Sequence, residues 1–151
     1  MKFSFLCDVH RQELNTNITK AIRLGREGFD TWQFFNEQGL WIEAIPHAGC
    51  AFEIAEILVT NKEIDMAVAY EWFYASTHLL ANGFNSLGYK EEAYEVMALA
   101  VERFDRELAL PKVDQTLVMN DLNKLHWCEH FASSYTSYNI VRDSSSGVSV
   151  H

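Results

Sequence analysis

The stretch Gly39-Leu-Trp-Ile-Glu-Ala44 recurs as Gly88-Tyr-Lys-Glu-Glu-Ala93, 49 residues further along the chain. In both copies an aromatic residue precedes the glycine by four positions and an alanine follows it by twelve: Phe35 and Ala51, Phe84 and Ala100. Glycine permits the turn between two helices, and small residues let the two helices approach closely. The repeat therefore predicts a helical hairpin that is used twice, an architecture that commonly provides binding surfaces.

Apolar residues at spacings of three and four predict five helices, at about residues 17–37, 40–59, 62–86, 89–109 and 114–139. Pro46 leaves two alternatives for the second helix, which either is kinked in its first turns or becomes regular only at the proline. Gly25 and Gly28 each weaken the first helix by about 1 kcal/mol relative to alanine, so close packing is their expected role. A short strand at residues 2–6 is the only extended element considered.

The composition favours one packed helical domain. The chain has 151 residues, 48% of them hydrophobic, and only two prolines. We expect an all-α domain over residues 1–140, with about five antiparallel helices that form either a helical repeat or a bundle. The serine-rich residues 141–151 have no core-forming pattern and are expected to be a flexible tail.

Charge and cysteine usage limit the partners and the compartment. The formal charge is −9, and there is no run of basic residues, which argues against nucleic acid as a ligand. Apolar runs fall far short of the roughly 20 residues that span a bilayer, so no membrane association is expected. Three widely spaced cysteines, Cys7, Cys50 and Cys128, do not suggest a disulfide framework, and a reducing cytoplasm is the expected location.

The repeated unit resembles the helical hairpin of the tetratricopeptide-repeat (TPR) family. The second unit matches the small, aromatic and turn positions of that family at Leu80, Ala81, Phe84, Gly88, Ala93, Met97 and Ala100. The first unit keeps Phe35, Gly39, Ala44 and Ala51, but it has the bulky Trp32 where a small residue is expected. The resemblance covers residues 17–109, with the fifth helix as a cap. The spacing exceeds the family's repeat of about 34 residues, and both units lack the closing proline.

The resemblance implies a non-enzymatic adaptor or regulatory module that binds a protein or peptide of unknown identity, and a homodimer is also considered. In the family, residues of the first helix of each hairpin line the concave groove. The corresponding positions here are Arg26, Phe29, Gln33, Asn36, His78, Asn82 and Asn85. For each of them an ordinary solvated helix face is the alternative. Trp32, Phe34 and Phe35 cannot all face inward, because consecutive residues are about 100° apart, so an exposed aromatic is expected.

Two cysteine–histidine pairs suggest an alternative function, zinc binding. Cys7-Asp-Val-His10 and His47-Ala-Gly-Cys50 together supply two sulfurs and two nitrogens, the ligand set of a closed tetrahedral site. Their order matches no known zinc-finger spacing, and small buried cysteines are the competing interpretation. His126-Trp-Cys-Glu-His130 also matches an H-x-x-E-H peptidase motif, but only 21 residues follow it, too few for the distant carboxylate ligand.

No sequence motif points to a reaction. The chain contains no phosphate-binding glycine loop, no nucleophile elbow and no Glu-x-x-His pair of the di-iron type. Absent motifs do not exclude catalysis, but nothing in the sequence proposes a reaction, and no cofactor is expected other than the alternative zinc. The remaining alternative is a helical bundle that binds a small ligand in a pocket lined by Tyr70, Trp72 and His78.

Overall fold

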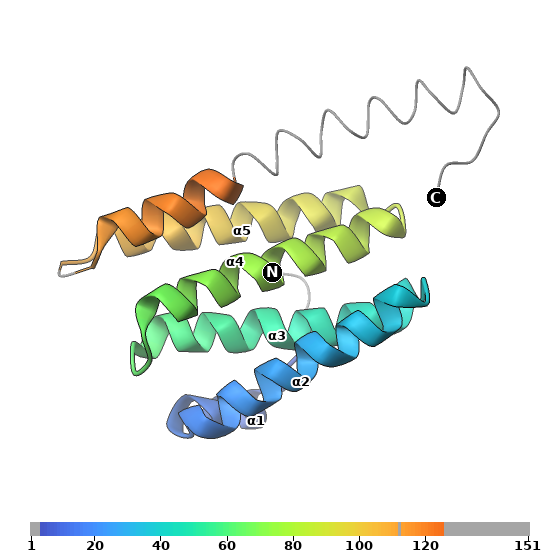
Figure 1. Cartoon of the computed structure of the whole chain (residues 1–151), viewed down its shortest axis with the longest axis horizontal. Coiled ribbons are helices and arrows are strands. Elements are labelled where there is room, and N and C mark those ends of the chain that lie inside the picture. The colour runs from blue at the N-terminus through green and yellow to red at the C-terminus, as the bar shows by residue number, and fades with distance from the viewer. Residues whose placement is uncertain (1–3, 112, 126–151) are drawn as a thin grey trace, which may run out of the picture.

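The computed structural model describes residues 4–111 and 113–125, and within these ranges the protein is all-α. The helices are α1 (Asp8–Thr16), α2 (Ile18–Glu37), α3 (Trp41–Asn61), α4 (Met66–Ser86) and α5 (Lys90–Leu108), followed by helical residues at 115–125. Figure 1 shows α2 to α5 side by side in chain order, with successive helices running in opposite directions and α3 between α2 and α4. The prediction of an all-α fold of antiparallel helices is confirmed.

The two glycine turns have the same hydrogen-bond pattern. Gly39 and Gly88 have φ values of +69° and +82°, in the left-handed region that favours glycine. In each turn the glycine amide donates to the carbonyl three residues earlier at 3.0 Å. The next amide donates to the carbonyl five residues earlier, at 3.0 Å in the first turn and 2.9 Å in the second. This pattern satisfies carbonyls at the helix end, and both turns lie at the same end of the molecule (Figure 1).

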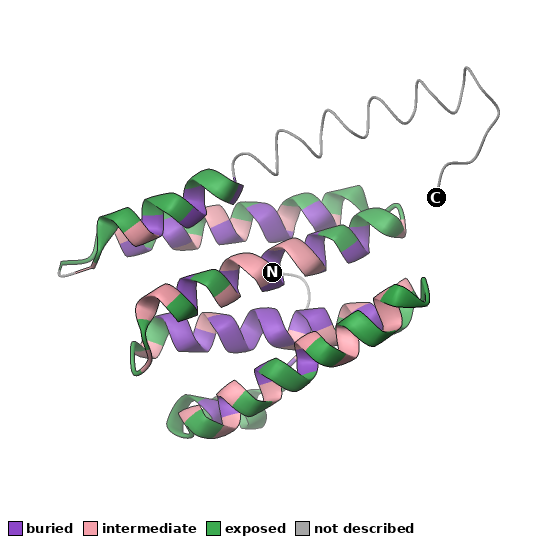
Figure 2. Ribbon diagram, viewed as in Figure 1, coloured by how far each residue is buried: buried purple, intermediate pink, exposed green. Residues whose placement is uncertain are grey.

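The helix α3 is the centre of the packing. It is buried along most of its length, whereas α2 exposes one side (Figure 2). The small residues of both repeat units, Ala44, Ala51, Ala93 and Ala100, are buried. Two glycines of α2 also mark close approaches: a Cβ on Gly25 would lie 2.8 Å from the ring of Trp72, and one on Gly28 would lie 3.1 Å from the carbonyl oxygen of His47. Close packing is therefore the role of both glycines, as expected.

The N-terminal part of the chain differs from the prediction. Residues 4–6, the described part of the expected strand, form no strand, and α1 follows them where no helix was predicted. Only Leu14 of α1 is buried. A helix with a single buried side chain has no apolar stripe, so the periodicity that revealed the other helices is absent here.

Two other helix starts are now defined. The helix α3 begins at Trp41 and includes Pro46, so the proline lies inside the helix and is not its first regular residue. The helix α4 begins at Met66 and not near residue 62, because Lys62 adopts a left-handed conformation with φ of 58°. Asp65 caps this helix, and its side chain accepts the amide of Ala67 at 2.9 Å.

The expected fifth helix, at residues 114–139, is only partly described. Residues 115–125 are helical, and Val118, Leu122 and Leu125 belong to the hydrophobic core. The remainder of this helix and the expected tail at 141–151 lie outside the described residues. Within the described ranges, none of the helices combines the length and apolar character that crossing a bilayer requires.

A pair of substitutions in α5 tests the packing of the second hairpin. Ala93 is buried, and Glu92 beside it is half-buried. Ala93→Leu inserts three heavy atoms into a filled interface, and we expect it to lower the free energy of unfolding by about 1–3 kcal/mol. Glu92→Leu should change it by no more than about 0.5 kcal/mol. Urea denaturation measures both, and equal losses would show that another face of α5 is buried.

Candidate functional site

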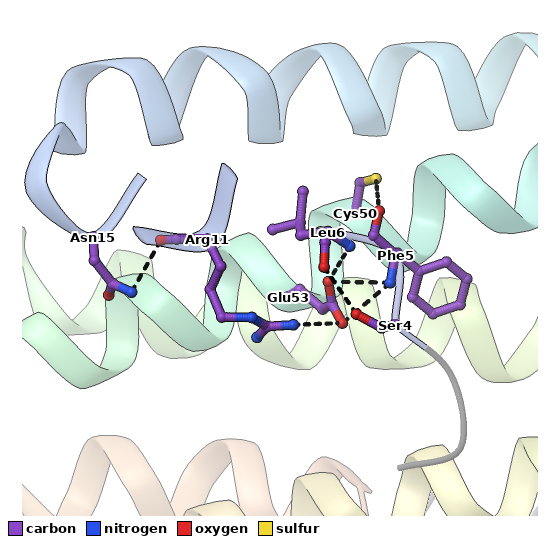
Figure 3. A network of polar contacts seen from close by, with 7 residues as sticks. All are labelled: Ser4, Phe5, Leu6, Arg11, Asn15, Cys50 and Glu53. Atoms are coloured by element: carbon purple, nitrogen blue, oxygen red, sulfur yellow. Dashed lines mark hydrogen bonds and ion pairs between the residues drawn. The ribbon is translucent and has the colours of Figure 1, made fainter. Parts of the chain in front are cut away.

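A buried carboxylate fixes the N-terminal segment (residues 4–7) against α3. Glu53 lies in α3 and is only 2% exposed. The amides of Phe5 and Leu6 donate to its carboxylate at 3.3 and 2.6 Å, and the guanidinium of Arg11 in α1 donates at 3.0 Å (Figure 3). A buried carboxylate needs such partners because its desolvation is costly. The three donors therefore hold both the segment and α1 on this face of α3.

The packing of Phe5 depends on a glycine in the same face of α3. A Cβ on Gly49 would lie 2.3 Å from ring atoms of Phe5, so the ring occupies the space that any other side chain would fill. The thiol of Cys50 lies 3.6 Å from the carbonyl oxygen of Phe5. Burial, with the nearby charge of Glu53 as a smaller cause, raises the pKa of this thiol above its ordinary value.

A cavity of about 290 Å³ lies beside this network, between the N-terminal segment, α1, α3, α4 and α5. It has four charged, three apolar and one hydroxyl-bearing lining residue: Arg11, Glu53, Glu56, Arg106, Phe52, Phe73, Leu99 and Ser4. The ring centroids of Phe52 and Phe73 are 5.3 Å apart, and both residues belong to the hydrophobic core. The cavity thus combines an apolar floor with charges of both signs.

The charges of the cavity divide into a paired and an unpaired set. Arg11 and Glu53 form an ion pair at 3.0 Å. Arg106 and Glu56, by contrast, form no ion pair with any residue in the described ranges. Glu56 is half-buried and Arg106 is exposed. One positive and one negative group are therefore available to a ligand in this cavity.

A second buried carboxylate, Glu107, joins α5 to the loop between α3 and α4. It is bonded to the ammonium of Lys62 and accepts the hydroxyl of Tyr70 at 2.9 Å, with Arg103 at 3.7 Å. Burial and this hydrogen bond to Glu107 raise the pKa of Tyr70 well above its ordinary value. Lys62, Tyr70 and Arg103 all contact the buried Glu107 carboxylate, so we assign this network to stability.

The predicted groove residues lie on α2 and α4. On α2, Arg26 and Gln33 are exposed, while Phe29 and Asn36 are half-buried. The ring of Phe29 meets the edge of Trp72 in α4, with 5.7 Å between centroids. Their role in binding stays a prediction.

The α4 members of the predicted groove are near one another. The side chains of His78 and Asn82 are 3.1 Å apart, within hydrogen-bond distance, and Asn85 is exposed at the end of the helix. Burial lowers the pKa of His78 below its ordinary value. The imidazole is thereby biased toward its neutral form at neutral pH, in which one ring nitrogen can accept a hydrogen bond.

The structure brings together one of the two predicted zinc-ligand pairs. The sulfur of Cys7 lies 3.2 Å from Nδ1 of His10, and both residues are exposed. His47 instead stacks on the ring of Phe35, with 5.6 Å between centroids. Among the described residues, no three cysteine, histidine or acidic side chains converge on a point that could hold a metal ion. Zinc binding by the four residues stays a prediction, and His126 and His130 lie outside the described ranges.

The three residues expected to line a small-ligand pocket, Tyr70, Trp72 and His78, make other contacts in the structure. Tyr70 is buried against Glu107, Trp72 covers Gly25, and His78 stacks on Tyr74. None of the three lines the 290 Å³ cavity. Glu53 and Glu56 were missed as site residues, although two acids within the apolar run from Ala48 to Val59 are a recognisable signal.

Comparison with known proteins gives no further assignment. No family model matches the chain, and neither the curated proteins nor the solved structures include a significant match.

Removal of the Glu53 carboxylate tests the network. Glu53→Ala leaves the guanidinium of Arg11 and two amides without their acceptor, and we expect a loss of about 3 kcal/mol in the free energy of unfolding. Glu56→Ala, three residues further along α3, removes a carboxylate without an ion pair and should cost no more than about 0.5 kcal/mol. Urea denaturation distinguishes them; a loss below about 1 kcal/mol for Glu53→Ala would contradict the buried network.

The two described cysteines should differ in reactivity. Cys7 is exposed, whereas Cys50 is half-buried and has a raised pKa. Because the thiolate is the reactive form, iodoacetamide at neutral pH should alkylate Cys7 well before Cys50. Peptide mapping by mass spectrometry follows each site separately. Equal rates would mean that the N-terminal segment does not cover Cys50 in solution.

Proposed function

We propose that the protein is a non-enzymatic binding module for a protein or peptide, built on two TPR-like hairpins. The observation that carries this proposal is a group of exposed apolar side chains around the turn between α2 and α3. Phe34 is 59% exposed, Ile42 is 70% exposed, and Leu40 between them is also exposed. We refer to these three residues as the turn patch.

The tight turn places all three residues of the turn patch at the same end of the hairpin. The amide of Leu40 donates to the carbonyl of Phe35 at 3.0 Å, which brings the end of α2 next to the start of α3. Burial of a phenylalanine or isoleucine side chain yields about 1.5–3 kcal/mol, so covering this patch would contribute substantially to binding. Clustered exposed apolar residues commonly mark protein interfaces.

The second turn supports the same proposal. Tyr89 and Tyr94, at the start of α5, are both exposed. The turn between α4 and α5 lies at the same end of the molecule as the first (Figure 1). Tyrosine is enriched at interfaces because its ring is apolar and its hydroxyl bonds to water or a partner. A partner that meets this end can therefore contact both hairpins.

The charge and the cysteines support further parts of the proposal. A formal charge of −9 disfavours nucleic acid and favours a neutral or basic partner surface. The wide spacing of the three cysteines supports a cytoplasmic location.

Replacement of two turn-patch residues tests the proposal. Phe34→Ser with Ile42→Ser should weaken partner capture by about tenfold, because the apolar contact area is lost. The control is Val9→Ser in α1, which removes an apolar side chain that is 74% exposed but lies outside the turn patch. Tagged full-length proteins are compared by quantitative mass spectrometry of the proteins they retain from a native lysate, after circular dichroism has shown equal helicity.

The outcomes are distinct. Loss of specific partners in the double variant and their retention in the control support the turn patch as the interface. If the occupant is a second copy of the chain, sedimentation should show a dimer for the wild type and a monomer for the double variant. Equal capture by all three proteins, with all three monomeric, contradicts the proposal.

A further inference from the structure

We infer that the 290 Å³ cavity binds a small zwitterion with an apolar side chain, the chemical class of the larger α-amino acids. This site uses residues of α3, α4 and α5 and shares none with the turn patch. It extends the proposed function and does not depend on it. The inference rests on the size of the cavity, on its two unpaired charges and on its apolar floor.

The volume sets the size of the ligand. An apolar cavity of about 150 Å³ in another protein accommodates benzene, which has six heavy atoms. A cavity of about 290 Å³ is therefore suited to roughly a dozen heavy atoms. Phenylalanine has about that many, and leucine and methionine are slightly smaller.

The two unpaired charges indicate which charged groups the ligand carries. Arg106 on α5 presents a guanidinium, whose planar donors suit a carboxylate. Glu56 on α3 presents a carboxylate that can accept hydrogen bonds from an ammonium group. The remaining charged pair, Arg11 and Glu53, is already joined at 3.0 Å. A ligand with one anionic and one cationic group would pair both of the charges left available.

The apolar lining residues indicate that the ligand also carries an apolar group. Phe52, Phe73 and Leu99 line the cavity together with these charges. An aliphatic or aromatic side chain placed on them loses contact with water, which favours binding. A ligand with only one charged group leaves either Arg106 or Glu56 without its partner and should bind less tightly. Recognition should therefore require the carboxylate, the ammonium and the apolar group together.

Isothermal titration of the full-length chain at low ionic strength tests this inference. The probes are L-phenylalanine, L-leucine and L-methionine, with 3-phenylpropionate and 2-phenylethylamine as analogues that lack the ammonium or the carboxylate. At least one of the amino acids should bind saturably. L-Phenylalanine should bind about tenfold more tightly than either analogue, since each analogue leaves one charge unpaired.

Matched variants assign the binding to the cavity. Arg106→Gln and Glu56→Gln should each weaken amino-acid binding by about tenfold. Lys90→Gln and Glu102→Gln remove charges of the same signs at exposed positions of α5 outside the cavity. These two control variants should change the dissociation constant for the amino acid by no more than about twofold. Both site variants remove groups without an ion pair in the described ranges, and circular dichroism checks that they fold.

Two results would overturn the inference. The first is that none of the three amino acids binds saturably up to about 10 mM, which corresponds to a negligible affinity. The second is binding that Arg106→Gln and Glu56→Gln leave unchanged, which would place the ligand elsewhere. The turn-patch variant should bind the amino acids like the wild type, so failure here is separable from failure of the proposed interface.

Discussion

Glu53 places a carboxylate inside the most buried helix of the protein, and the structure around it follows from the need to satisfy that charge. An unpaired carboxylate at 2% exposure would cost several kcal/mol. Its partners are the amides of Phe5 and Leu6 and the guanidinium of Arg11, which come from the segment before α1 and from α1 itself. A short helix with one buried side chain has little other reason to pack here. The same contacts form one wall of the cavity beside α5.

The two proposed binding sites occupy different parts of the fold, and they differ in the interactions that they offer a ligand. The turn patch depends on the tight glycine turn, which leaves Phe34 and Ile42 exposed at the end of a hairpin. The cavity depends on charges held apart by packing, with Arg106 on α5 and Glu56 on α3. Both sites contact α3, at its start and in its second half. The helix α3 packs against α1, α2 and α4, so both proposed sites are built on the central element of the fold.

The helices with a clear apolar stripe and the glycine turns could be predicted from the sequence, because periodicity and left-handed glycine are local signals. Close packing at Gly25 was predicted, but its neighbour Trp72 was not, because Trp72 comes from another helix. The helix α1 was missed because only Leu14 is buried. The cavity was not predicted either. Its residues come from positions that are separated by up to about a hundred residues, and Arg106 and Glu56 resemble ordinary surface charges until the helices are placed.

Amide hydrogen exchange of Phe5 and Leu6, followed by NMR in the wild type and in Glu53→Ala, tests the central role of Glu53 most directly. In the wild type both amides donate to a buried carboxylate, so both should exchange more slowly than an unstructured chain. In Glu53→Ala the acceptor of both amides is lost, and the two amides should lose most of that protection while the amides of α5 keep theirs. Equal protection of Phe5 and Leu6 in both proteins would contradict the claim that this carboxylate holds the N-terminal segment and α1 in place.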